Sequence, residues 1–166
     1  MTISRDILIK EMKEVFRTDL KRINHALAVL NYAEQIQSVE GGDPFIVTAA
    51  AILHDIGIQE AERKYNSSAG KYQEIEGPPI AKKILENYGV DENSLEHICK
   101  IIANHHSARD IDTTEFRIIW DADWLVNLPG ETADADKAKL KKIIDKTFKT
   151  TTGHKMATEL FIKARG

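Results

Sequence analysis

One short segment constrains this chain more than any other: the apolar run from Ala49 to Gly57, AAAILHDIG. Alanine and leucine are strong helix formers, and apolar residues on nearly every face predict a helix buried on most sides. The run ends in His54 and Asp55, an imidazole next to a carboxylate. Burial of an ionised aspartate is costly unless the charge has partners. A divalent metal would satisfy both side chains; the simpler alternative is a buried His–Asp hydrogen bond that ties two helices together.

Composition predicts one soluble globular domain over residues 1–166. The chain is 42% hydrophobic and 30% charged, and 23 basic against 26 acidic side chains give a net charge of −3. A clustered basic excess is absent, which argues against a nucleic-acid partner. No apolar run approaches the length of a membrane span, no signal-peptide pattern opens the chain, and the single Cys99 cannot form an internal disulfide. These features predict a cytoplasmic protein with no membrane partner.

The pattern of apolar residues predicts an all-α fold. Only four prolines occur, period-two alternation is scarce, and Gly, Pro, Asn and Asp separate the periodic stretches. Helices are expected at about 5–17, 19–39, 43–57, 76–89, 91–106, 113–129, 133–149 and 153–165. The polar segment 59–73 is expected to be a lid-type connection or a short irregular helix.

Several metal-binding or acid–base side chains lie inside these apolar helical stretches. They are His25, His54, Asp55, His105, His106, Asp121 and Asp123. Residues two apart lie on roughly opposite faces of a helix, so Asp121 and Asp123 cannot both reach one ion.

The ordered set of His25, His54-Asp55 and the segment ADWL at 122–125 resembles the H…HD…D signature of the HD-domain superfamily of metal-dependent phosphohydrolases. The resemblance spans about residues 22–127 and implies one HD-domain-like helical bundle of about seven to nine helices. It also implies that His25, His54, Asp55 and Asp123 bind the ion. Asp123 is preferred to Asp121 because the family's last ligand usually follows an alanine and precedes a bulky residue and a leucine, but the choice between them stays open.

Two imidazoles and two carboxylates suit Mn, Fe, Co, Ni or Zn better than Ca. The resemblance implies one ion, a second being less favoured: family members with two metals carry additional histidines between the His-Asp pair and the late aspartate, and no histidine occurs here between His54 and His97. The expected catalytic residues are His54 and Asp55, together with His105 and His106 as acid–base groups or groups that orient the ligands.

The resemblance implies hydrolysis of a small phosphate ester, a nucleotide or related molecule, by a metal-activated water. Many family members carry a lysine directly after His-Asp-x-Gly, where this chain has Ile58. Lys64, Lys71 and Arg109 are therefore candidate substrate-binding cations, the alternative being ordinary solvated surface charges. Other functions stay open: a diiron oxygenase, or a catalytically weak HD domain that binds a nucleotide or a partner protein. Oligomeric state is also open, a homodimer being one alternative.

Overall fold

The computed structural model describes residues 3–165, which form α-helices and their connections without a β-strand. This confirms the predicted all-α fold. The α-helices in that range are α1 (Arg5–Phe16), α2 (Leu20–Glu40), α3 (Pro44–Leu53), α4 (Ile58–Tyr65), α5 (Gly70–Asn87), α6 (Glu92–Asn104), α7 (Thr114–Glu131), α8 (Lys137–Thr147) and α9 (Thr151–Ala157). A π-helical turn (Thr158–Ile162) and a 3₁₀ turn (Lys163–Arg165) follow. No helix within 3–165 combines the length and the apolar character needed to cross a membrane.

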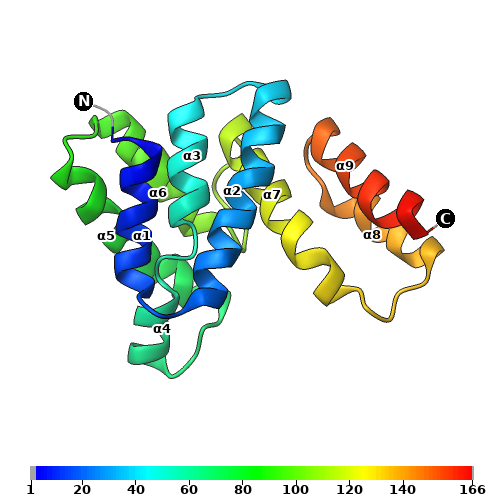
Figure 1. Cartoon of the computed structure of the whole chain (residues 1–166), viewed down its shortest axis with the longest axis horizontal. Coiled ribbons are helices and arrows are strands. Elements are labelled where there is room, and N and C mark those ends of the chain that lie inside the picture. Colours follow the sequence, from blue (N-terminus) through cyan, green and yellow to red (C-terminus); the bar gives the residue numbers. More distant parts are fainter. Residues whose placement is uncertain (1–2, 166) are drawn as a thin grey trace.

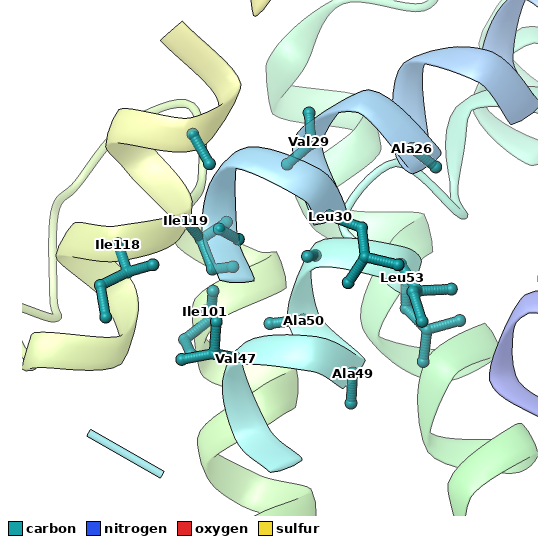
Figure 2. Close-up of a cluster of buried hydrophobic side chains, with 14 of the residues drawn as sticks. Ala26, Val29, Leu30, Val47, Ala49, Ala50, Leu53, Ile101, Ile118 and Ile119 are labelled. Atoms are coloured by element: carbon teal, nitrogen blue, oxygen red, sulfur yellow. The ribbon is translucent and has the colours of Figure 1, made fainter. Parts of the chain in front are cut away.

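Helix α3 lies at the centre of the molecule. Small alanines on its surface let the backbones of neighbouring helices approach closely, and it packs against α1, α2, α6 and α7. Figure 2 shows this core around Val47, Ala49, Ala50 and Leu53 of α3. The surrounding side chains are Ala26, Val29 and Leu30 of α2, Ile101 of α6, and Ile118 and Ile119 of α7. The chain that leaves α3 therefore starts from a rigid, fully buried position.

The predicted helix starts are largely correct because capping side chains mark them. Asp43 Oδ1 accepts hydrogen bonds from the backbone N–H groups of Phe45 and Ile46 at 2.9 and 3.3 Å, with Pro44 at the first helical position. Asp19 and Asp91 cap α2 and α6 in the same way.

The segment 59–73 contains a short helix, one of the two predicted alternatives, but the predicted helix start at about residue 76 is wrong. Residues 58–65 form the regular helix α4, and α5 begins at Gly70, so that Pro78 and Pro79 lie inside a helix rather than at its start. Prolines favour the first turn of a helix, but tertiary contacts can override this preference. The helical turns before Gly77 carry Gln73 and Glu74, which form hydrogen bonds with the turn that follows α6. Pro129 likewise lies inside α7, which continues to Glu131.

The terminal helices α8 and α9 cover α7 on the side of the molecule away from α1 and α5 (Figure 1). The indole N–H of Trp120 in α7 donates to the carbonyl oxygen of Thr147 at 3.1 Å. These helices thus fix α7 from outside while α2 and α3 contact it from inside.

Candidate metal centre

His54 and Asp55 lie in the tight turn that connects α3 to α4. The backbone N–H of Ile56 donates to Leu53 O and that of Ile58 to Asp55 O, both at 3.1 Å. Gly57 follows because the turn lies directly on the backbone of α5. A Cβ atom at Gly57 would be 2.7 Å from Cα of Gly77. The glycine after the His-Asp pair is thus explained by close approach of two backbones.

The ring of His54 is fully buried and held in one tautomer. Its Nδ1 lies 2.8 Å from Ala51 O, and a carbonyl oxygen can only accept, so Nδ1 carries the proton. In the neutral ring the lone pair is therefore on Nε2. A backbone partner on one ring nitrogen is the usual way in which proteins orient a metal-binding imidazole.

Four donor atoms from distant parts of the chain meet at His54 Nε2. The other three are Nε2 of His25 in α2, Oδ2 of Asp55 and Oδ1 of Asp123 in α7. His25 Nε2 is 3.0 Å from Asp123 Oδ1 and 3.3 Å from both His54 Nε2 and Asp55 Oδ2. His54 Nε2 is 3.4 Å from Asp55 Oδ2 and 3.5 Å from Asp123 Oδ1.

These separations fit a shared cation. Transition-metal ligands lie about 2.0–2.2 Å from the ion, which puts adjacent ligands about 2.8–3.1 Å apart in octahedral geometry and about 3.3–3.6 Å apart in tetrahedral geometry. The five donor separations given above lie between 3.0 and 3.5 Å. Without a proton or an ion, lone pairs of His54 and two carboxylates would face one another in a buried space. The donor set, nitrogen and oxygen without sulfur, suits the divalent transition metals predicted from the sequence.

The electrostatics of the cluster favour positive charge at its centre. Burial opposes a charge on His54, but Asp55 and Asp123 outweigh it and raise the pKa of His54 well above its usual value. Burial opposes charge on Asp55 too, yet His54 and His105 lower its pKa well below the usual range. Burial also opposes a charge on Asp123, but hydrogen bonds from His25 and His54 lower its pKa below the usual value. The cluster therefore keeps two ionised carboxylates around a site for a cation.

The structure brings Asp123, not Asp121, into this cluster. The two oxygens of Asp121 accept hydrogen bonds from the backbone N–H groups of Lys149 and Thr150, each at 2.8 Å, and from the Thr150 hydroxyl at 2.6 Å. Asp121 thereby ties α7 to the start of α9. Asp123 lies on the opposite side of α7, where Nδ2 of Asn127 donates to its Oδ1 at 3.1 Å.

His105 repeats the arrangement of His54 at the end of α6. Its Nδ1 lies 2.7 Å from Ile102 O and its Nε2 lies 3.2 Å from Asp55 Oδ1. Asp55 thus presents one oxygen to His25 and His54 and the other to His105. Donor atoms of Asp55, His105 and His106 lie within 4.8 Å of one another and could hold an ion as well.

His106 is fixed by α5. Its Nε2 lies 2.8 Å from Oε1 of Gln73, and Gln73 Nε2 donates to Ser68 O at 2.6 Å, so the proton of His106 is on Nε2. Burial, with His105 next to it, lowers the pKa of His106 to about 4. Glu74 accepts the backbone N–H groups of His106 and Ser107, each at 3.0 Å. His106 is therefore a neutral, oriented imidazole at neutral pH.

Comparison with known proteins identifies the family. A family model described as HD domain matches residues 22–148, which include every donor of the cluster. The chain belongs to the HD domain family. The resemblance predicted from sequence, and with it the prediction of an enzyme of the HD hydrolase superfamily, is confirmed.

Two solved structures share this HD fold. A predicted HD superfamily hydrolase from an uncultured Thermotogales bacterium is 22% identical, with a TM-score of 0.72 over 96% of this chain and 86% of that one. YpgQ of Bacillus subtilis is 21% identical, with a TM-score of 0.66 over 97% and 92%. The symmetrical bis(5'-nucleosyl)-tetraphosphatase of Staphylococcus aureus (strain NCTC 8325 / PS 47) is 28% identical over 142 residues, 77% of this chain and 72% of the relative.

A pocket of about 230 Å³ opens onto the donor cluster of this HD domain. It is lined by Lys21, Arg22, His25, Asp55, Ile58, Gln73, His106, Asp123 and Asn127. Four residues predicted from the sequence thus share the pocket: His25, Asp55, His106 and Asp123.

The three candidate substrate-binding cations do not line this pocket. Lys64 Nζ lies 2.9 Å from Oε1 of Glu76, and Lys71 lies over the ring of Tyr72. Arg109 lines a separate hollow next to Lys149.

Sequence reasoning missed four polar or charged lining residues: Lys21, Arg22, Gln73 and Asn127. Helical spacing could have indicated three of them, because Lys21 and Arg22 lie four and three residues before His25, and Asn127 lies four after Asp123. Gln73 had no such signal, because its position depends on how α5 packs against the end of α6.

Proposed function

We propose that this chain is a metal-dependent phosphohydrolase acting on a small phosphate ester, a nucleotide or a related molecule. One observation carries the proposal: Nε2 of His25, Nε2 of His54 and oxygens of Asp55 and Asp123 converge with ligand-like separations of 3.0–3.5 Å at the base of a pocket. Membership in the HD domain family and the similarity to a bis(5'-nucleosyl)-tetraphosphatase support it.

Under this proposal His25, His54, Asp55 and Asp123 hold one divalent transition ion (Mn, Fe, Co, Ni or Zn). When bound, such an ion supplies a water of lowered pKa and polarises the phosphoryl group. The protein contributes orientation: Ala51 O fixes His54, and Asn127 fixes Asp123. His106, neutral and with its proton on Nε2, lines the pocket where it can accept a hydrogen bond from water or substrate through Nδ1.

The test is a hydrolysis screen with nucleoside mono-, di- and triphosphates, bis(5'-nucleosyl) tetraphosphates and alarmones, with several metals. His54→Ala and Asp55→Ala should lower kcat/KM by at least about a thousandfold, because the charge stabilisation by the ion is worth several kcal/mol. Asp123→Asn is a milder second variant in case the buried positions do not fold. His154→Ala, at an exposed histidine of α9 that pairs with Asp145, is the matched control and should retain activity. Full hydrolysis by folded His54→Ala and Asp55→Ala would refute the proposal.

The second donor group, Asp55, His105 and His106, favours one further candidate, a diiron oxygenase. Elemental analysis of protein purified without chelators separates the two. Two irons per chain with oxygen-dependent turnover favour the oxygenase, and one ion with hydrolysis favours the phosphohydrolase. The one-domain organisation of residues 1–166, the cytoplasmic location and the oligomeric state stay predictions.

A further inference from the structure

The two cationic side chains at the pocket differ in whether they form ion pairs. Two cationic residues line it, Lys21 and Arg22, both in the first turn of α2. The guanidinium of Arg22 lies 2.9 Å from Asp19 Oδ2 and 3.0 Å from Glu62 Oε1, so two carboxylates already offset its charge. Lys21 is exposed and forms no ion pair with any residue in the range 3–165. Its ammonium is therefore the charge available to an anion in the pocket.

The position of Lys21 on α2 sets which part of a substrate it can contact. Lys21 and His25 are four residues apart, so they lie on one face of the helix, about 6 Å apart along the axis. A phosphate bound next to His25 would therefore lie about one helical turn from the backbone of Lys21. The flexible four-carbon stem of lysine lets its ammonium follow an extended group.

The net charge of the metal centre also bears on how phosphates beyond the first are bound. Two carboxylates, Asp55 and Asp123, offset the charge of a divalent ion, so the centre has little net charge with which to attract a long anionic chain. Each phosphate beyond the first adds negative charge near the pocket, where Lys21 is the unpaired cation among the lining residues.

We propose that Lys21 binds the second phosphate of a phosphate chain and makes this site prefer nucleotides with two or more phosphates over monophosphates. This inference rests on the proposed function. Lys21 is then a specificity-determining residue, and the substrate class is the nucleoside polyphosphates.

The test compares Lys21→Met with the native enzyme, using a nucleoside triphosphate, a bis(5'-nucleosyl) tetraphosphate and a nucleoside monophosphate with the same metal. Loss of a charged contact should raise KM for both polyphosphates roughly ten- to hundredfold, with kcat and the monophosphate KM changing by less than about threefold. Lys21→Arg should restore most of the polyphosphate affinity. Lys141→Met, at an exposed lysine of α8 that does not line the pocket, is the matched control. Equal losses for all three substrates, or none, overturn the inference.

A binding experiment separates failure of this inference from failure of the proposed function. Metal-loaded native protein and Lys21→Met are titrated calorimetrically with inorganic phosphate and with pyrophosphate, which requires no hydrolysis of a nucleotide. Tighter binding of pyrophosphate by the native protein, lost in Lys21→Met, supports the role of Lys21 even if the screen finds no activity. A pyrophosphate preference that survives in Lys21→Met, or binding of neither anion by the native protein, overturns it.

Discussion

Asn127 has a direct influence on a proposed metal ligand. Its amide Nδ2 donates to Asp123 Oδ1 at 3.1 Å, and the same oxygen lies 3.0 Å from His25 Nε2. A donor on a carboxylate limits its rotation, so Asn127 keeps one oxygen of Asp123 directed at the cluster. Groups that orient metal ligands in this way contribute to affinity without touching the ion.

We therefore expect Asn127→Ala to weaken metal binding by about 10- to 100-fold while the helical fold is retained. Competition with a chromophoric chelator measures the affinity, and circular dichroism checks the fold. Asn31→Ala removes the same side chain from an exposed position of α2 and should leave the affinity unchanged. Equal affinities of native protein and Asn127→Ala would contradict this role.

At the scale of residues, the sequence indicated candidate side chains for the site but not their hydrogen-bond and ion-pair partners. Seven metal-binding or acid–base side chains occur in apolar helical stretches, and the family resemblance selected His25, His54, Asp55 and Asp123 among them. The role of Asp121 could not be predicted, because its partners at Lys149 and Thr150 are 28 and 29 residues away. Lys64 is a candidate substrate-binding cation by sequence, with a solvated surface charge as the alternative; its ion-pair partner Glu76 becomes its neighbour only once α4 and α5 pack together.

At the scale of elements, the contact between the α3–α4 turn and α5 controls where Asp55 lies. A Cβ atom at Gly57 would lie 2.7 Å from Gly77 Cα and 2.9 Å from the carbonyl carbon of Glu76. Both neighbours are backbone atoms, so neither can move aside by a rotamer change. The φ angle of Gly57 is −86°, which other residues also adopt, so close packing alone explains the glycine.

Gly57→Ala should lower the free energy of unfolding by about 1–3 kcal/mol or more and weaken metal binding, because overpacking displaces the turn. Urea unfolding and a metal titration measure the two effects. Gly130→Ala is the matched control: no atom lies within 4 Å of its Cβ position, and it is inside α7. That variant should be stabilised by about 0.5–1 kcal/mol through helix propensity. A Gly57→Ala protein as stable as the native one would contradict the close contact.

Element boundaries were predictable where a capping side chain is local and not where the deciding contact is distant. Asp43-Pro44 marks the start of α3 from sequence alone. The start of α5 at Gly70 depends on Gln73 and Glu74, which bind residues more than 30 positions away.

At the scale of the whole molecule, the candidate metal centre joins α2, the turn after α3, and α7. Bound metal would therefore add a further link between α2 and α7, which pack against each other and are both contacted by α9. In the metal-free protein a proton on His54 can offset part of the negative charge of the two carboxylates. Burial opposes a charge on His54, but Asp55 and Asp123 still raise its pKa above 6.5. A raised histidine pKa adds stability that is complete below pH 6.5 and is lost as the pH rises through the folded-state pKa.

The melting temperature of chelator-treated protein should accordingly fall as the pH is raised above 6.5. Metal-loaded protein should not show this fall, because the ion replaces the proton and binds more tightly as the pH rises. Thermal unfolding is measured across a pH series, with and without chelator. The difference in melting temperature between metal-loaded and chelator-treated protein should widen toward alkaline pH. His54→Gln should flatten the dependence. A difference that is independent of pH would contradict a proton on His54.

The long separation between donors also matters while the chain is being made. His25 and Asp123 are 98 positions apart, and Asp123 belongs to α7. Under the proposed ligand set, a nascent chain that already contains His25, His54 and Asp55 still lacks one carboxylate and the helix that presents it. Such an intermediate is a weaker chelator than the finished protein, so ions captured early can exchange until α7 docks. The identity of the resident ion would then be decided late in synthesis, by the pool of metal that surrounds the nearly complete chain.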